Sequence, residues 1–191
     1  LETSGDDVLE MHLIGIAFSY EAGKGYYLSI PEDRTEATHL LDKFRSFFEN
    51  EEIEKVGAQL KTTIKILNNY EIGLKGDFFD TMIAHYLLNP DMRHDLNVLA
   101  EIYLNYQPMK VETLLGKKGK NRLSMRAVDL SKQAEFKVEE ADVILQLKAV
   151  FEDDLKKNEL TKLYETLEIP LVNVLASMEI EGIKMNVEFL N

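Results

Sequence analysis

The sequence predicts an α/β fold in which strands come first and helices follow. Apolar and aromatic residues dominate much of residues 1–30, where two nearby glycines indicate a turn. From residue 35 onward the apolar residues recur at three- and four-residue steps, the spacing of one helix face. In a chain of 191 residues, this order predicts one sizeable domain, a β layer followed by helices, with a short appendage.

The first strands should form a hairpin or a meander. Residues 13–18 are a mainly apolar run, residues 21–25 contain Gly23 and Gly25, and a β-rich run resumes at residues 26–30 before Pro31. A short buried strand is expected at residues 55–58 and a brief extended piece near Leu74.

The helices are expected to begin with one that Thr35 caps and that carries apolar residues from Ala37 to Phe48. Asp80 should cap a helix that ends at Asn89, before a proline. The remaining helices are expected at residues 60–69, from residue 94 or 95 to about residue 103, and at residues 131–157, 160–167 and 170–182.

Composition limits the possible function. The chain has no cysteine, which excludes disulfides, thiolate metal sites and cysteine nucleophiles. Its longest apolar runs are shorter than the ~20 residues that a bilayer needs, so a soluble, cytoplasmic chain without a membrane partner is expected. Leu1 is not an initiator methionine and lies at the edge of an expected strand, so we expect a piece of a longer protein.

The net charge of −12 is unfavourable for binding a phosphate backbone, unless carboxylates hold divalent cations or basic residues are concentrated locally. Residues 116–126 are such a concentration, with no acid among them. The loop is either simply solvated or contacts phosphate, and the sequence favours neither reading. Its basic residues are Lys117, Lys118, Lys120, Arg122 and Arg126.

The acidic residues of the long helix at residues 131–157 lie on different faces of that helix. One stripe, from Glu135 through Glu139 and Asp142 to Gln146, is polar and is expected to face water. Another stripe is apolar except for Glu140 and consists of Phe136, Glu140, Val143, Leu147 and Val150. An ionised carboxylate there is either paired or bound to a cation, or it lies at the edge of the stripe and reaches water.

Glu2, at the end of the first strand, is a possible partner for Glu140. Two carboxylates that are brought together repel unless one is protonated or a cation bridges them, and Mg²⁺ or Mn²⁺ prefers such oxygen ligands. That arrangement suits phosphodiester chemistry. His85 and His94, by contrast, are assigned to structure, since both lie in or beside expected helices.

Four segments closely resemble the 3'-5' exonuclease domain of bacterial DNA polymerase I, in the family A polymerases, and the likeness runs from Glu2 to the end. In chain order they are FFDTMIAHYLLNPDMRHDLNVLAEIYL, GKKGKN, EEADVILQLK and LEIPLVNVLASMEIEGIKMN. The last resembles the helix that leads into the polymerase domain. The resemblance therefore implies an exonuclease-like domain at residues 1–168 and the start of a polymerase domain at residues 169–191.

The resemblance also implies a ribonuclease-H-like fold, a mixed central sheet flanked by helices. Members of this superfamily remove 3'-terminal nucleotides with four acids and two divalent metals ~3.5 to 4 Å apart. Their first motif is Asp-x-Glu. Glu2 matches the glutamate, and the aspartate would immediately precede Leu1.

The other two motifs are altered in this sequence. The second, which ends in tyrosine and aspartate, aligns with GAQLKTT at residues 57–63 and places the neutral Thr63 where an anionic ligand belongs. The third is Tyr-x-x-x-Asp, where Phe136 lacks the hydroxyl that helps to position water. Glu140 keeps the charge but extends it by ~1.5 Å, more than the ~0.5 Å that catalytic geometry tolerates.

These substitutions predict a domain of a DNA replication and repair polymerase whose exonuclease activity is lost or vestigial. Glu2 and Glu140 would hold Mg²⁺ or Mn²⁺ weakly, if at all. The domain would act as a scaffold and guide the single-stranded 3' end of DNA through Lys117, Lys118, Lys120 and Arg122. Two alternatives are a working two-metal proofreading exonuclease with a relaxed site and a single-strand DNA docking module.

Overall fold

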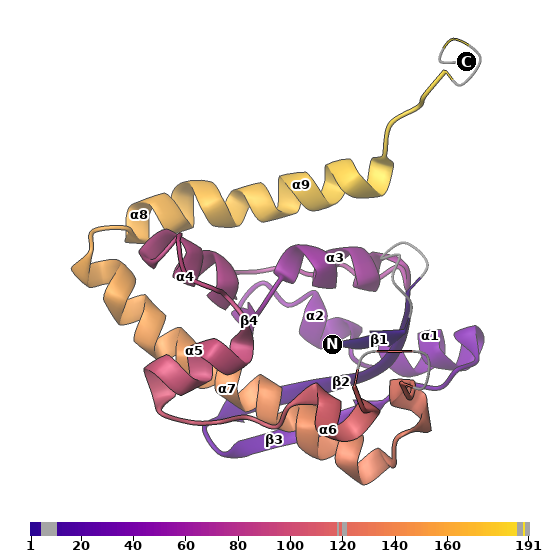
Figure 1. The fold of residues 1–191 in the computed structure, drawn as a ribbon. Helices are drawn as coiled ribbons and strands as arrows, with labels where there is room; N and C mark the ends of the chain where they lie inside the picture. The colour runs from indigo at the N-terminus through magenta and orange to yellow at the C-terminus, as the bar shows by residue number, and fades with distance from the viewer. Residues whose placement is uncertain (5–10, 118, 120–121, 187–188, 190–191) are drawn as a thin grey trace.

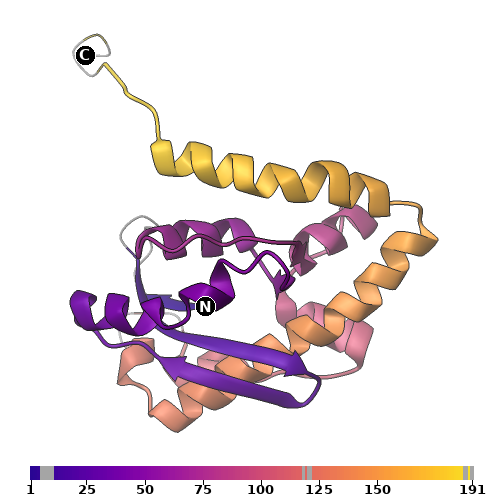
Figure 2. The ribbon, with the colours of Figure 1, turned by 180° about the vertical axis from the view of Figure 1, so that it is seen from behind.

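The computed structural model describes residues 1–4, 11–117, 119, 122–186 and 189 (Figure 1). The long helix α7 (Leu130–Lys157) packs against the sheet of β2 (His12–Glu21) and β3 (Lys24–Ser29). Seen from behind, the two strands lie side by side in front of α7 (Figure 2). The last helix, α9 (Ile169–Glu181), lies along the far side of the domain against α3 (Leu60–Asn68).

The α/β class is confirmed, but the described strands lie in two sheets. β1 (Glu2–Ser4), β2 and β3 are antiparallel neighbours in that order. β4 (Lys55–Gly57) pairs in parallel with β5 (Phe78–Asp80), so the extended piece expected near Leu74 lies a few residues later. A Cβ at Gly15 of β2 would stand 2.0 Å from the Tyr27 hydroxyl, so a side chain there would require the Tyr27 ring to move.

Most predicted helices are present. Asp80 caps α4, as expected, but the cap of α1 is Asp33 rather than Thr35, since the Asp33 carboxylate accepts from the Glu36 amide at 2.9 Å. A short helix at residues 111–115 was not anticipated. The other helices are α1 (Arg34–Asp42), α2 (Arg45–Phe48), α4 (Thr81–Leu88), α5 (Leu96–Leu104), α6 (Val111–Leu115) and the 3₁₀ turn η1 (Met125–Ala127).

The two helices predicted at residues 160–167 and 170–182 are one continuous rod. α8 (Thr161–Leu163) passes through a π-helical turn, η2 (Tyr164–Glu168), directly into α9. Pro170 does not break the rod. It directly follows the π-helical turn, in which the Ile169 amide bonds to the carbonyl of Tyr164, five residues back. Gly182, with φ of 70°, ends the rod as expected.

Two apolar clusters position the elements. One joins β2 and β3 to α1, α2 and α3 and includes Leu13, Leu41 and Leu67. The other joins α4, α5 and α7 and includes the predicted stripe residues Val143 and Leu147. None of the helices in the described part of the chain is long and apolar enough to span a membrane.

The stripe of acids on α7 was wrongly expected to be a merely solvated face. The Glu139 carboxylate accepts from the Tyr106 hydroxyl at 2.5 Å and from the Met109 amide at 2.8 Å. Asp142 accepts from the Gly23 amide in the β2–β3 turn at 2.8 Å. These carboxylates tie α7 to two distant loops, because they satisfy polar groups that residue spacing along α7 cannot reveal.

Glu179 fixes α9 to α3. Its carboxylate pairs with the ammonium groups of Lys61 at 2.6 Å and Lys65 at 2.5 Å. Hydrogen bonds from these two lysines hold the pKa of Glu179 at about 2. Val172 and Ala176 of α9 are buried on the same face. Lys61, part of the second motif, is therefore engaged in packing α9.

Candidate functional site

Three charged side chains, one from β1 and two from α7, meet beside the three-stranded sheet. The Lys137 ammonium lies 2.5 Å from a carboxylate oxygen of Glu2 and 2.5 Å from one of Glu140. The Lys137 and Glu2 side chains are only 14% and 15% exposed, and Glu140 is 31% exposed. Such partial burial makes the pairing stronger than that of an ordinary surface ion pair.

The backbone explains why these groups converge. β1 pairs with β2 so that Glu2 lies opposite Gly15, and α7 packs against β2. Lys137 and Glu140 are three residues apart on α7, which places them on the same side of the helix. The sequence prediction that Glu2 and Glu140 could come together therefore agrees with the geometry, and a lysine bridges them.

The electrostatics keep Lys137 charged. Burial by itself would lower the pKa of its ammonium, but the negative charges of Glu140 and Glu2 and their hydrogen bonds outweigh burial and raise that pKa. The phenol of Tyr27 senses the same site: burial and the charge of Glu2 raise its pKa.

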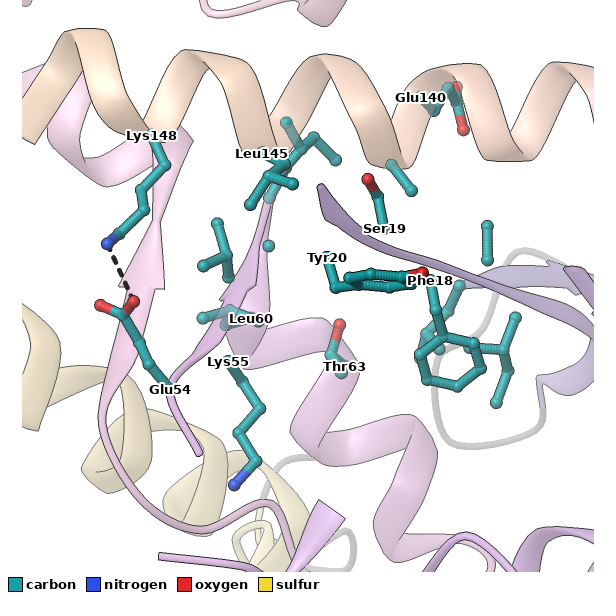
Figure 3. Close-up of a pocket in the computed structure, with 18 of the residues that line it drawn as sticks. Phe18, Ser19, Tyr20, Glu54, Lys55, Leu60, Thr63, Glu140, Leu145 and Lys148 are labelled. Atoms are coloured by element: carbon teal, nitrogen blue, oxygen red, sulfur yellow. Dashed lines mark ion pairs between the residues drawn. The ribbon is translucent and has the colours of Figure 1, made fainter. Parts of the chain in front are cut away.

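A cavity of about 420 Å³ opens beside this cluster, and Lys137 is among the residues that line it. Glu140 and Thr63 also line it, from α7 and α3 (Figure 3). Its other cationic residues are already engaged. Lys148 pairs with Glu54 at 2.9 Å, and the buried Lys55 donates to the backbone carbonyls of residues 50 and 75. The rest of the lining is mainly apolar and includes Ile16, Phe18, Phe48, Leu60, Ile144 and Leu145.

The two altered motif residues lie in different environments. Thr63, on α3, contributes a half-buried wall residue to the cavity and brings no charge to it. Phe136 is 4% exposed and packs in a separate apolar cluster with Ile14, Leu115 and Met125. Phe136 is thus a core residue of α7, and its ring does not line the cavity.

These residues do not fit a two-metal centre. Glu2, Glu140 and Lys137 together carry one net negative charge, and Thr63 adds a neutral hydroxyl. In the part of the chain that the structure describes, no group of three or more His, Cys, Asp or Glu side chains is placed to hold a metal ion. Among the described residues, the donors at this site are therefore too few and too nearly neutral to hold two divalent cations.

Sequence reasoning missed Lys137. It lies between Phe136 and Glu140, the two positions that the third motif specifies, and the motif itself specifies nothing at residue 137. The available signal was the three-residue spacing of Lys137 and Glu140, which brings opposite charges together on a helix. Contact with Glu2 could not be read from the sequence, because it depends on how β1 meets α7.

The basic loop is only partly described. Lys117 and Arg122 are exposed, and neither forms an ion pair with the described residues. Lys118 and Lys120 lie outside the described residues. Arg126 has a structural role, since its guanidinium donates to the carbonyls of Leu13 at 3.0 Å and Ile30 at 3.2 Å.

The two histidines contact each other, in agreement with their assignment to structure: His85 is in the core on α4, and His94 is half-buried just before α5. His85 is fully buried, with its Nδ1 2.7 Å from that of His94 and its Nε2 3.1 Å from the Tyr103 hydroxyl. Burial, followed by the charge of His94, lowers the pKa of His85.

Comparisons of sequence place the chain among known proteins. Residues 1–156 match the sequence model of a 3'-5' exonuclease family of DNA polymerase A. The DNA polymerase I of Borreliella burgdorferi is 32% identical over 192 residues, covering 99% of this chain and 21% of that protein. The DNA polymerase I of Bacillus subtilis is 29% identical, covering 100% and 21%. The chain thus spans about a fifth of these relatives.

Solved structures share the fold. Brucella melitensis NrnC with bound Mg²⁺ superposes with a TM-score of 0.75 at 18% identity, covering 95% of this chain and 83% of that one. The POL domain of Pol1 from M. smegmatis, in complex with DNA primer-template and dNTP, gives a TM-score of 0.68 at 22% identity, covering 88% and 25%. The predicted ribonuclease-H-like exonuclease fold is confirmed.

Proposed function

This chain belongs to the 3'-5' exonuclease family of DNA polymerase A, and from that membership we propose that it is a non-cutting exonuclease-like domain of a bacterial DNA polymerase I. It acts as a scaffold within a cytoplasmic polymerase that serves DNA replication and repair. In this proposal it has little or no capacity to remove a 3'-terminal nucleotide. Residues 169–191 begin the polymerase domain.

One observation carries the proposal: the Lys137 ammonium lies between Glu2 and Glu140. In the two-metal reaction, divalent cations bind such carboxylates, activate water and stabilise the leaving oxygen. An ammonium can neutralise the carboxylates, but it has no open coordination position for water or a phosphate oxygen. The residues at the site therefore stabilise one another by ion pairing, but they do not provide the metal-bound water that the reaction needs.

Thr63 and Phe136 support the same conclusion. Thr63 lines the cavity with a neutral side chain, where the resemblance places an aspartate. Phe136 is buried in the core and has no hydroxyl to orient water. Each change removes a different requirement of the reaction, so reversing any one of them would not restore the site.

The direct experiment incubates the purified full-length protein that contains this chain with a single-stranded DNA carrying a labelled 3' end, with Mg²⁺ and separately with Mn²⁺. We expect the rate of nucleotide removal to equal that of a sample without protein. A circular dichroism spectrum of the same preparation controls for folding. Metal-dependent shortening of the 3' end would contradict the proposal and favour the alternative, a working two-metal proofreading exonuclease.

A role in guiding DNA is proposed for the basic loop, because Lys117 and Arg122 are exposed and carry charges that the described residues do not neutralise. The polymer bound would be single-stranded DNA near its 3' end. This part of the proposal does not require catalysis, so it is also compatible with the reading of the domain as a single-strand DNA docking module.

Replacing Lys117, Lys118, Lys120 and Arg122 with alanine should weaken binding of single-stranded DNA and flatten its dependence on salt. The slope of log K against log salt should fall by about 0.7 for each phosphate that the variant no longer neutralises. Fluorescence anisotropy at several salt concentrations measures it. Alanine at four exposed basic residues elsewhere, Lys43, Arg93, Lys132 and Lys162, removes the same number of charges; it is the matched control and should change the slope less. Equal slopes for the loop variant and the unchanged chain would contradict the role.

A further inference from the structure

We propose that Lys137 is an internal substitute for a divalent cation, and that its ammonium masks a cation site formed by Glu2 and Glu140. The inference deepens the proposed function, on which it rests, by naming what replaced the metal. It predicts that removing this one positive charge creates a binding site for Mn²⁺ between Glu2 and Glu140.

The distances support a substitute for a bridging cation. The Lys137 nitrogen is 2.5 Å from an oxygen of each carboxylate, so those two oxygens are at most about 5 Å apart. Oxygen ligands surround Ca²⁺ at ~2.3 to 2.6 Å and Mg²⁺ at ~2.0 to 2.1 Å. The ammonium thus contacts both carboxylates at once and occupies the position that a bridging metal ion would take. A divalent cation would compete with it for the same oxygens and be repelled by its charge.

Without Lys137, Glu2 and Glu140 would remain close together and should attract a cation from solution. Glu2 and Glu140 come from β1 and α7, and both of these elements contact β2, which keeps them near one another independently of the ion pairs. Their side chains are 15% and 31% exposed, so water would screen their mutual repulsion only partly. Lys137 and Glu140 also line the 420 Å³ cavity, which gives a small hydrated ion a route to the oxygens.

A second lysine on the same helix provides a comparison. Lys148 also pairs with two carboxylates, Glu54 at 2.9 Å and Glu152 at 3.3 Å, and it also lines the cavity. Its partners are 41% and 42% exposed and are free to move apart in water. Removing Lys148 should therefore leave two separate hydrated carboxylates and no cation site.

The test compares the 191-residue chain with its Lys137→Met and Lys148→Met variants. Methionine keeps an unbranched side chain but has no charge. Binding of Mn²⁺ is measured from the loss of the free Mn²⁺ electron paramagnetic resonance signal. We expect Lys137→Met to bind one Mn²⁺ at least tenfold more tightly than the unchanged chain or Lys148→Met. Adding Glu140→Gln to Lys137→Met should abolish this gain.

Each outcome decides the matter. Equal Mn²⁺ affinity for the unchanged chain and Lys137→Met would overturn the inference, as would tight binding by the unchanged chain. Were Lys137→Met to unfold in a chelator, Mn²⁺ should restore its folded circular dichroism spectrum, and failure to do so would also overturn it. Lys137→Arg, which keeps a cation, should bind Mn²⁺ no better than the unchanged chain.

The outcome is separable from that of the proposed function. Removal of 3' nucleotides by the unchanged chain would contradict the loss of catalysis, whatever Lys137→Met binds. Conversely, an inactive chain whose Lys137→Met variant gains no Mn²⁺ site would leave the proposed function standing and refute only the substitution of lysine for metal.

Discussion

Replacing Asp80 with alanine should lower the free energy of unfolding by about 3 kcal/mol, combining a lost helix cap with unsatisfied buried donors. Its carboxylate is 1% exposed and accepts from the amides of Leu60 at 2.6 Å, Met82 at 2.9 Å and Ile83 at 3.3 Å. One side chain therefore caps α4 and also satisfies the first amide of α3. Alanine would leave all three donors without this acceptor.

The loss of stability caused by Asp80→Ala should also depend on pH. Burial raises the pKa of Asp80, against the opposing effect of its backbone hydrogen bonds. The folded state then holds a proton more readily than the unfolded state does, so the contribution of this group falls as pH rises through the folded pKa. The difference in stability between the unchanged chain and Asp80→Ala should therefore be larger at acidic pH than at neutral pH.

Urea denaturation at several pH values measures both effects. Asp95→Ala is the matched control, since Asp95 caps α5 from an exposed position through the Asn97 amide at 3.0 Å. It should cost about 1 kcal/mol. Equal losses for Asp80→Ala and Asp95→Ala would show that the contact with Leu60 contributes nothing.

Phe151→Ala should have the largest effect on stability, about 3 to 5 kcal/mol. The Phe151 ring on α7 is fully buried, with its centroid 5.0 Å from that of Tyr103 and 5.4 Å from that of His85. Alanine would leave a void where α4, α5 and α7 meet. A loss of this size is a large part of the ~5 to 15 kcal/mol that stabilises a typical domain.

Chemical denaturation of the Phe151→Ala variant checks this expectation. Lys157→Ala lies on the same helix but changes a side chain that is 72% exposed, so its cost should stay within about 0.5 kcal/mol. A Phe151→Ala loss below 1 kcal/mol would mean that neighbouring side chains close the void, and that this junction of helices is less rigidly packed than the structure indicates.

Local patterns in the sequence predicted much of the fold, because caps and periodicity depend on neighbouring residues. Asp80 caps the start of α4 and Gly182 ends α9, both as predicted. Val143 and Leu147 are buried, as their spacing indicated. The cap of the first helix was misplaced by two residues, since Asp33 and Thr35 both suit that role and only the path of the chain decides between them.

The site was less predictable, because its contacts join segments far apart in the chain. Glu2 and Glu140 were expected to approach one another, yet the cation between them was anticipated as a metal and not as Lys137. Asp142 was expected to face water, but it binds the amide of Gly23, a residue 119 positions away. Periodicity shows which face of a helix a residue occupies and says nothing about which distant group meets that face.

The π-helical turn at residues 164–168 changes the direction in which the side chains before and after it point from the C-terminal helical rod. Tyr164, Val172 and Ala176 are all buried, although an unbroken α-helix would turn Tyr164 and Val172 about 80° apart over eight residues. Absorbing one extra residue in the wide turn reduces that offset to about 20°. The Tyr164 hydroxyl accepts from the Asp80 amide at 2.7 Å, and Val172 packs against Leu60 of α3. Without the wide turn, one of these two contacts would be lost, because either Tyr164 or Val172 would point away from its partner.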